Sequence, residues 1–358
     1  MIRQVELSLK FLNKEKRNKL SEFYSKYIEA VKFFVDVLWE SDEYKFVTKE
    51  TLQKCNTDIT ARAKQCAGKQ ALSIINGTFK KHKQRIYRRD ILKKNGEDTS
   101  KLDFLISKKP SKPEVGNIPI ELDSRFIAIL DTSNSFDLWI KIAGINGRVI
   151  CPLKKTKMFN KWDKLGKIKQ ACRLTPNSIN LYFECEKKLN SANKTIGIDV
   201  GINSVVTTSD GVQNKNCPHG HTMNSILTKI SKKKKGSKAF KRAIEHRKNF
   251  INWSINQLNL NNCNSIVVEN IFNMRKGKNR GRFLSHFTYT IIFNKLEQLC
   301  EEWNVSINKV NPAYTSQKCS ACGETKTENR KDEHFKCKKC GYTQNADINA
   351  AKNILASV

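Results

Sequence analysis

The chain has 358 residues, enough for two or three domains with their own hydrophobic cores. It carries 66 lysine and arginine residues against 34 aspartate and glutamate residues, which gives a formal net charge of +32. Such an excess favours a polyanionic partner. Nucleic acid fits better than a membrane surface, because no apolar run approaches the roughly 20 residues that a bilayer requires. We therefore predict a nucleic-acid-binding protein that makes no membrane contact.

The residues at the start of the chain alternate between apolar and polar side chains up to residue 11, which predicts a β-strand. Asn13 is placed to cap the following helix, and apolar residues then recur at helical spacing to about residue 108. The segment Lys109–Pro113 ends this pattern. Short β-like segments separated by turns fill residues 117–190. We predict an antiparallel barrel or sandwich there, completed by the first strand and interrupted by a helical domain.

From residue 194 onward, apolar strands alternate with helices, which predicts an α/β layer. The predicted elements are a hairpin within residues 195–208, helices near 239–260 and 286–303, and strands at 265–270 and 305–310. Asp199 and Glu269 stand near the ends of two of these strands. A third acid, Asp347, opens a short helix near the end of the chain.

The three acids have plain explanations when each is considered alone: a turn, a solvated strand end or a helix cap. Carboxylates at the ends of adjacent strands can also converge at one edge of a sheet. Their hard oxygen atoms suit Mg²⁺ or Mn²⁺. Two such ions roughly 4 Å apart can activate water and stabilise the leaving oxygen when a phosphodiester is hydrolysed.

Cysteines appear in two distinct patterns. Cys319 and Cys322 form one CxxC pair, and Cys337 and Cys340 form a second pair after a spacer of fourteen residues. Two such pairs predict one closed, structural zinc site, since a redox role needs only one pair. His334 lies between them and is superfluous as a fifth ligand. The other eight of the 12 cysteines show no disulfide framework, and the N-terminus has no signal-peptide pattern, so we expect a reducing, cytoplasmic setting.

Two basic clusters are candidates for phosphate contact. One lies in the helical region and the other follows the predicted hairpin. Their members are Lys80, Lys81, Arg85, Arg88 and Arg89, and then Lys232, Lys233, Lys234 and Lys235. A solvated helix face and a flexible loop would also explain them, but their density in so cationic a chain favours phosphate contact.

One further segment contains metal-ligand residues: Cys217, His219 and His221. Two histidines and one cysteine spaced so closely cannot easily surround one ion. We therefore predict a polar loop at this position.

The order of these motifs closely resembles that of the TnpB family, the transposon-encoded RNA-guided nucleases ancestral to the type V CRISPR effectors. The resemblance covers roughly residues 194–358, and the first half of the chain matches much less specifically. The matching motifs are Gly197–Gly201, Val267–Asn270, Tyr314–Gly323 and Asn345–Asn353.

The resemblance implies an α+β multidomain fold. Its parts would be a RuvC-like, RNase H-like α/β nuclease domain, an inserted zinc ribbon, an OB-like β-barrel wedge domain and a helical recognition domain that interrupts the barrel. The implied ranges are 193–316 and 343–358 for the nuclease domain, 317–342 for the ribbon, 1–12 and 117–192 for the wedge domain, and 13–116 for the recognition domain.

The resemblance also implies an activity, namely RNA-guided cleavage of double-stranded DNA next to a short target-adjacent motif. Asp199, Glu269 and Asp347 would be the catalytic residues and would hold two Mg²⁺ or Mn²⁺ ions. The guide RNA would come from a transposon end or resemble a crRNA. A monomer or an RNA-scaffolded dimer would act in a prokaryotic cytoplasm, associated with the nucleoid.

Three alternatives remain open at this point. The chain could be a miniature type V CRISPR effector, a structure-selective or junction nuclease that uses no guide, or a non-cleaving RNA-guided repressor or regulator of transposition.

Overall fold

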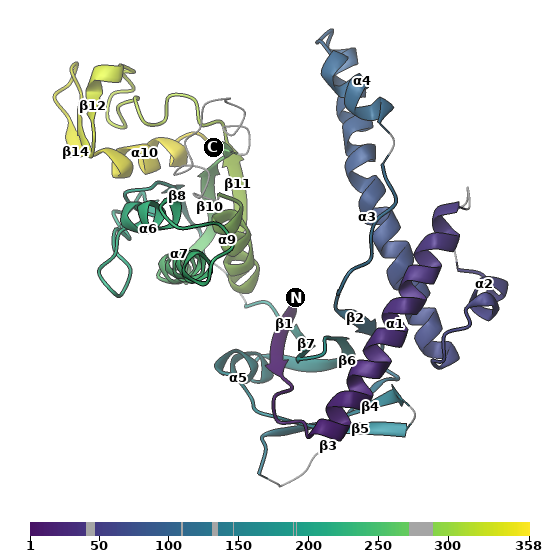
Figure 1. The fold of residues 1–358 in the computed structure, drawn as a ribbon. Helices are drawn as coiled ribbons and strands as arrows, with labels where there is room; N and C mark the ends of the chain where they lie inside the picture. Colours follow the sequence, from purple (N-terminus) through teal and green to yellow (C-terminus); the bar gives the residue numbers. More distant parts are fainter. Residues whose placement is uncertain are drawn as a thin grey trace. The chain divides into compact units, whose positions relative to one another are not determined.

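The computed structural model describes residues 1–40, 47–108, 110–130, 135–145, 147–188, 190, 192–271 and 289–358. Lys109 of the predicted helix break and residues 286–288 of a predicted helix lie outside this part. The chain divides into two compact units, residues 2–186 and residues 187–358, with Met1 grouped with the second (Figure 1). The finer division into four domains stays a prediction.

The strands of the first unit form two antiparallel sheets. One has the order β1 (Ile2–Ser8), β7 (Ser178–Cys185), β6 (Gly166–Leu174) and β2 (Ile120–Leu122), and the other comprises β3 (Ile127–Leu130), β4 (Leu138–Ile145) and β5 (Gly147–Leu153). Strand β1 pairs with β7 from end to end, as the sequence predicted. Helix α5 (Lys157–Asp163) packs Phe159 edge-on against Phe183 of β7. An OB-like barrel stays a prediction, since the described strands belong to two hydrogen-bonded sheets.

Helices fill the rest of the first unit: α1 (Lys14–Glu40), α2 (Lys49–Lys54), α3 (Ala61–Lys94) and α4 (Ser100–Ser107). The Asn13 side chain accepts a hydrogen bond from the Lys16 N–H at 2.9 Å and caps α1, as predicted. Tyr27 of α1 is buried and donates to the Glu121 carbonyl of β2 at 2.8 Å, which fixes the helix to the sheet.

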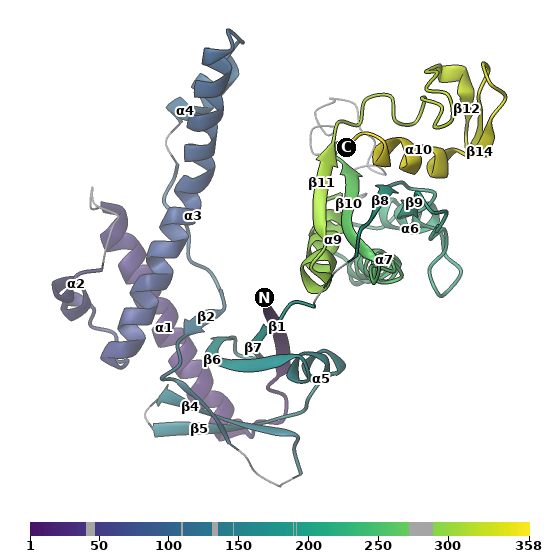
Figure 2. The ribbon, with the colours of Figure 1, turned by 180° about the vertical axis from the view of Figure 1, so that it is seen from behind.

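Helix α3 is buried only along its first half. Its buried residues all lie between Ala63 and Ile75, so the remaining turns extend beyond the core together with α4 (Figure 2). A helix that buries so little of its length leaves most of its side chains in water, and this is the segment that carries the first basic cluster.

The second unit is built on a four-stranded sheet with the order β11 (Ser306–Val310), β10 (Cys263–Glu269), β8 (Lys194–Asp199) and β9 (Thr207–Thr208). The first three strands are parallel, and β9 is antiparallel to β8. Its helices are α6 (Met223–Ser231), α7 (Lys238–Asn256), α9 (Tyr289–Trp303) and α10 (Ala346–Leu355). The α/β layer predicted from the alternating pattern is therefore present.

Helices cover both faces of this sheet. Ile196, Ile198 and Val268 belong to one apolar core with residues of α6, α7 and α9, such as Phe250 and Phe293. Alternate residues of a strand point to opposite faces, so Gly197 faces the other way, where α10 packs against β8.

A small three-stranded sheet precedes α10. It consists of β12 (Arg330–Lys331), β13 (His334–Lys336) and β14 (Thr343–Asn345), and β14 runs directly into the helix. Across the described residues of both units, the helices are too short or too polar to pass through a bilayer.

Candidate catalytic and zinc sites

Asp199 and Glu269 are brought together by the register of two parallel strands. Ile198 of β8 pairs with Val268 of β10, and the two acids are the next residues along their strands. Asp199 lies two residues beyond Gly197, and Glu269 lies two residues beyond Val267, which pairs with Gly197. Both acidic side chains therefore point to the same face of the sheet as Gly197, the face that α10 covers. The predicted convergence of these two strand ends follows from backbone geometry.

Asp347 reaches the same face from the first turn of α10. The plain N-cap explanation for this residue is wrong, because Asn345 is the cap: its side-chain oxygen accepts from the N–H groups of Asp347 and Ile348 at 3.0 and 3.2 Å. The Asp347 carboxylate is instead paired with the guanidinium of Arg330 at 2.8 Å, and the residue is only 6% exposed.

Gly197 allows α10 to lie close to β8. A Cβ atom at this position would stand 2.0 Å from the Ala351 carbonyl oxygen and 2.8 Å from the Leu355 backbone nitrogen. No side chain fits at such distances from backbone atoms. The glycine two residues before Asp199 therefore sets the spacing between that acid and the helix that carries Asp347.

The three acids affect one another electrostatically. Burial raises the pKa of Asp199 to about 7, and the negative charges of Glu269 and Asp347 add to the shift, while Arg330 opposes it. Burial also raises the pKa of Glu269, against the lowering effects of the Thr315 hydroxyl and Arg330. Two carboxyl groups with raised pKa values beside the charge of Asp347 form a place where a cation would be stabilised.

The three acids are spaced more widely than the four cysteines. Within the described ranges, the four cysteines are the one set of three or more Cys, His, Asp or Glu side chains whose ligand atoms all lie within 4.8 Å of one another. The oxygen atoms of the three carboxylates therefore do not all lie within that distance of one another. Oxygen donors are the ligands that Mg²⁺ and Mn²⁺ prefer, so the donor set fits these ions.

Two residues of this site were missed by the sequence analysis. Arg330 comes from β12, and nothing in its local pattern distinguishes it from other basic residues; β14 brings its sheet beside α10. Thr315 hydrogen-bonds to the Glu269 carboxylate from the turn that follows β11. Tyr314 precedes it with φ of 65°, and its carbonyl accepts from the N–H groups of Gln317 and Lys318 at 3.0 and 2.9 Å. Of the two missed residues, only Thr315 lies within a motif that the sequence analysis had identified, Tyr314–Gly323.

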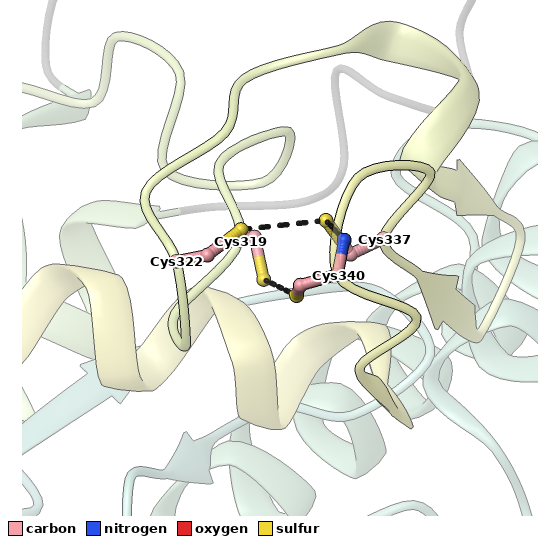
Figure 3. Close-up of side chains that lie close together, drawn as sticks. All are labelled: Cys319, Cys322, Cys337 and Cys340. Atoms are coloured by element: carbon pink, nitrogen blue, oxygen red, sulfur yellow. Dashed lines mark hydrogen bonds between the residues drawn. The ribbon is translucent and has the colours of Figure 1, made fainter.

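The four cysteines of the two CxxC pairs converge on one point (Figure 3). The sulfur atoms of Cys319 and Cys340 are 3.8 Å apart, and those of Cys322 and Cys337 are 3.6 Å apart. Zn–S bonds of about 2.3 Å give tetrahedral edges of about 3.8 Å, whereas a disulfide needs about 2.05 Å. The arrangement therefore fits a zinc ion.

Each CxxC pair lies in a tight turn. The Gly323 N–H donates to the Cys319 carbonyl at 2.9 Å, and the Gly341 N–H donates to the Cys337 carbonyl at 3.1 Å. Both glycines adopt positive φ, at 78° and 74°, which explains why the sequence reads CxxCG twice. The N–H groups of Cys340 and Lys339 lower the pKa of the Cys337 thiol, which favours the thiolate that binds zinc.

The base of the cysteine cluster is tied to α10 by two buried amides. Asn349 accepts from the Ser320 N–H at 3.0 Å and donates to the Lys318 carbonyl at 2.8 Å. Asn353 donates to the Thr315 carbonyl at 2.8 Å. The cluster, the Thr315 turn and the helix bearing Asp347 are thus held as one assembly, so a metal at the cysteines would also hold the acid in place.

The predicted basic residues differ in their exposure to solvent and in the partners that they already contact. Lys80, Lys81 and Arg88 of α3 are exposed. Arg85 donates to the Leu105 carbonyl at 3.4 Å, and Arg89 pairs with Asp90 at 2.7 Å. In the second cluster Lys232, Lys234 and Lys235 are exposed between α6 and α7, while Lys233 is partly buried. Nucleic-acid contact at both clusters stays a prediction.

Known proteins share the motifs of the second unit. Residues 289–354 match the model of the Cas12f1-like, TNB domain. A CRISPR-associated endodeoxyribonuclease Cas12f1 of Sulfoacidibacillus thermotolerans is 42% identical over 93 residues, which are 26% of this chain and 22% of that protein. A TnpB-like protein of Aquifex aeolicus is 34% identical over 95 residues, 25% of this chain and 31% of that protein. The chain is therefore similar to TnpB-like and Cas12f1 proteins over part of its second unit.

The fold extends the likeness to nearly the whole chain. A solved Cas12f1–sgRNA–target DNA complex contains a chain that superposes with a TM-score of 0.55 at 15% identity, over 94% of this chain and 81% of that one. At such identity the match shows a shared fold. The sequence matches span less than one third of each of the two relatives named above.

Proposed function

We propose that this chain is an RNA-guided DNA endonuclease of the TnpB type that hydrolyses double-stranded DNA beside a short target-adjacent motif. The observation that carries the proposal is the convergence of Asp199, Glu269 and Asp347 on one face of the sheet, where burial and mutual repulsion raise the pKa of Asp199. The chain's excess of positive charge supports a nucleic-acid substrate. The fold around these acids would be RuvC-like, as their order along the chain implies.

The acids would hold two Mg²⁺ or Mn²⁺ ions, which would supply an activated water molecule and stabilisation of the leaving oxygen. Thr315 would orient the Glu269 carboxylate through its hydrogen bond. Arg330 would pair with Asp347 in the resting state and lie near the phosphate when DNA is bound. The zinc ribbon would be structural, since its four sulfur ligands leave no open position.

The first unit would hold the nucleic acid. Its outer α3 segment presents Lys80, Lys81 and Arg88 to solvent, together with the ring of Tyr87, which is 70% exposed. Cations suit a phosphate backbone, and an exposed ring suits an unpaired base. The guide RNA would supply sequence recognition by base pairing while the protein recognises shape and charge. The helices would be a recognition lobe and the two sheets a wedge domain.

The test begins with the RNA that the chain retains. We would express the chain together with its flanking DNA in bacteria, purify it and sequence the bound RNA. The complex would then be incubated with Mg²⁺ and plasmids that carry the matching target beside randomised sequence. We expect one discrete RNA and cleavage of matched plasmids only.

Each other result would select an alternative. Cleavage without bound RNA would indicate an unguided junction nuclease. A discrete RNA without cleavage would indicate a repressor or regulator of transposition, although the retained set of three acids argues against that. An RNA with repeat-derived segments would indicate a miniature CRISPR effector.

A further inference from the structure

A second cluster of metal-ligand side chains lies in the second unit, on residues that the proposed nuclease chemistry does not use. The loop between β9 and α6 contributes Cys217, His219 and His221, and α7 contributes His246. All four line one cavity of about 580 Å³. Three of the chain's six histidines are gathered at this point.

The loop is a narrow hairpin that places its ligands close together. Asn216 and Thr222 form an antiparallel bridge, and the Cys217 N–H donates to the His221 carbonyl at 2.9 Å. Gly220 has a φ of 79°, which lets the chain reverse within five residues. Cys217 and His221 therefore stand opposite each other at the base of the turn, with His219 at its tip.

The sequence alone disfavoured a metal here because three residues on one short loop cannot surround an ion. The fold adds a fourth ligand from another element, since His246 lies on α7, 29 residues beyond Cys217 in the chain. Its Nε2 atom is 3.5 Å from the sulfur of Cys217. A tetrahedral zinc ion with bonds of about 2.3 Å to sulfur and about 2.05 Å to nitrogen separates those two ligand atoms by about 3.5 Å.

The imidazole positions are also compatible with a shared ion. The His221 and His246 ring centroids are 5.3 Å apart, close to the roughly 5 Å expected for two rings on one zinc ion. The His219 and His246 centroids are 6.2 Å apart. Since no three of the four ligand atoms all lie within 4.8 Å of one another, binding requires the exposed side chains of His219 and His221 to turn inward.

The surroundings suit a borderline metal ion. Cys217 is 5% exposed and lies within the apolar core of the unit, which protects a bound thiolate. Arg242 and Glu245 also line the cavity, with opposite charges.

We propose that Cys217, His219, His221 and His246 form a second zinc site, distinct from the four-cysteine cluster. One thiolate and three imidazoles complete a tetrahedral set with no open position, which is typical of a structural site. The ion joins the hairpin loop to α7 across the cavity. This proposal is independent of the nuclease function.

The test is a zinc count on the full-length chain. Protein expressed in zinc-supplemented medium is purified without chelator, and zinc per chain is measured by plasma mass spectrometry against amino-acid analysis. We expect about two zinc ions per wild-type chain, one for each four-ligand site. Cys217→Ser, His246→Asn and the double variant His219→Asn with His221→Asn should each bind about one. The double variant changes only exposed loop side chains, so it keeps the test valid if the buried Cys217→Ser variant fails to fold.

Two controls separate the sites. Cys322→Ser removes a ligand of the other cluster and should also lower the count by about one, while His334→Asn changes an exposed histidine outside both clusters and should leave the count unchanged. Cobalt-loaded wild type minus cobalt-loaded double variant should show a spectrum with one thiolate ligand. One zinc ion per wild-type chain, or an unchanged count in both His246→Asn and the double variant, would overturn the proposal.

Discussion

The two units of this chain carry function in different ways. In residues 187–358 the candidate chemistry lies on buried or half-buried groups whose positions are fixed by strand register, a glycine contact and a cysteine cluster. In residues 2–186 it rests on exposed cations along α3, a helix that buries only its first half. A single substitution should therefore abolish the function of the second unit but only weaken that of the first.

The largest expected effect is on catalysis. Asp199→Asn should reduce plasmid cleavage by on the order of 10³-fold or more, because residues that act as a unit fail together. RNA affinity should be unchanged. Asp210→Asn is the matched control, since this acid of the same unit is paired with Lys194 and its side chain is 42% exposed. Equal cleavage by both variants would mean that Asp199 has no special role.

The same acid should make the stability of the magnesium-free chain depend on pH. The pKa of Asp199 is raised from 3.8 to about 7, so its stabilising contribution is present below about pH 4 and is lost as the pH rises through 7. Asp199→Asn should remove that loss and stabilise the chain at pH 8 by about 2–4 kcal/mol. Urea unfolding at pH 4, 6 and 8 measures it, and parallel curves for wild type and variant would contradict the raised pKa.

Replacement of a glycine by alanine should change stability in opposite directions in the two units. Gly197→Ala should destabilise the second unit by about 1–3 kcal/mol, because its Cβ meets the backbone of α10. Gly77→Ala should stabilise the first unit by about 0.5–1 kcal/mol, because it adds a methyl group to open space in the middle of α3. Urea unfolding reports both, and a neutral Gly197→Ala would mean that α10 is not held close to β8.

The smallest effect is expected on the surface of α3. Arg88→Gln should weaken RNA binding a few-fold and lower the slope of log affinity against log salt by about 0.7, the value for one phosphate contact on a single strand. Arg89→Gln should change the slope little, because Arg89 already pairs with Asp90 and lies near Asp103. Equal slopes for these neighbouring variants would place RNA elsewhere on the unit.

The sequence predicted what depends on local pattern. The strands ending in Asp199 and Glu269, the helix after Asp347 and the pairing of the first strand with the later β segments were all expected. Those features follow from the two-residue and 3.6-residue periods of strands and helices.

Contacts between elements distant in the sequence were not predicted. Arg330 reaches Asp347 because the small sheet folds back on α10, and His246 reaches Cys217 because α7 packs beside the hairpin. Neither residue differs in its local pattern from other basic or polar residues. The limited burial of α3 could not be predicted either, because its sequence is helical throughout and only tertiary packing decides which turns are buried.

The central claim is that Asp199, Glu269 and Asp347 hold divalent ions together. Titration of RNA-free protein with Mn²⁺, followed by the electron paramagnetic resonance signal of the free ion, tests it most directly. We predict about two bound ions per wild-type chain and a clear loss in each of Asp199→Asn, Glu269→Gln and Asp347→Asn. Wild-type binding retained by any one of these variants would contradict the account.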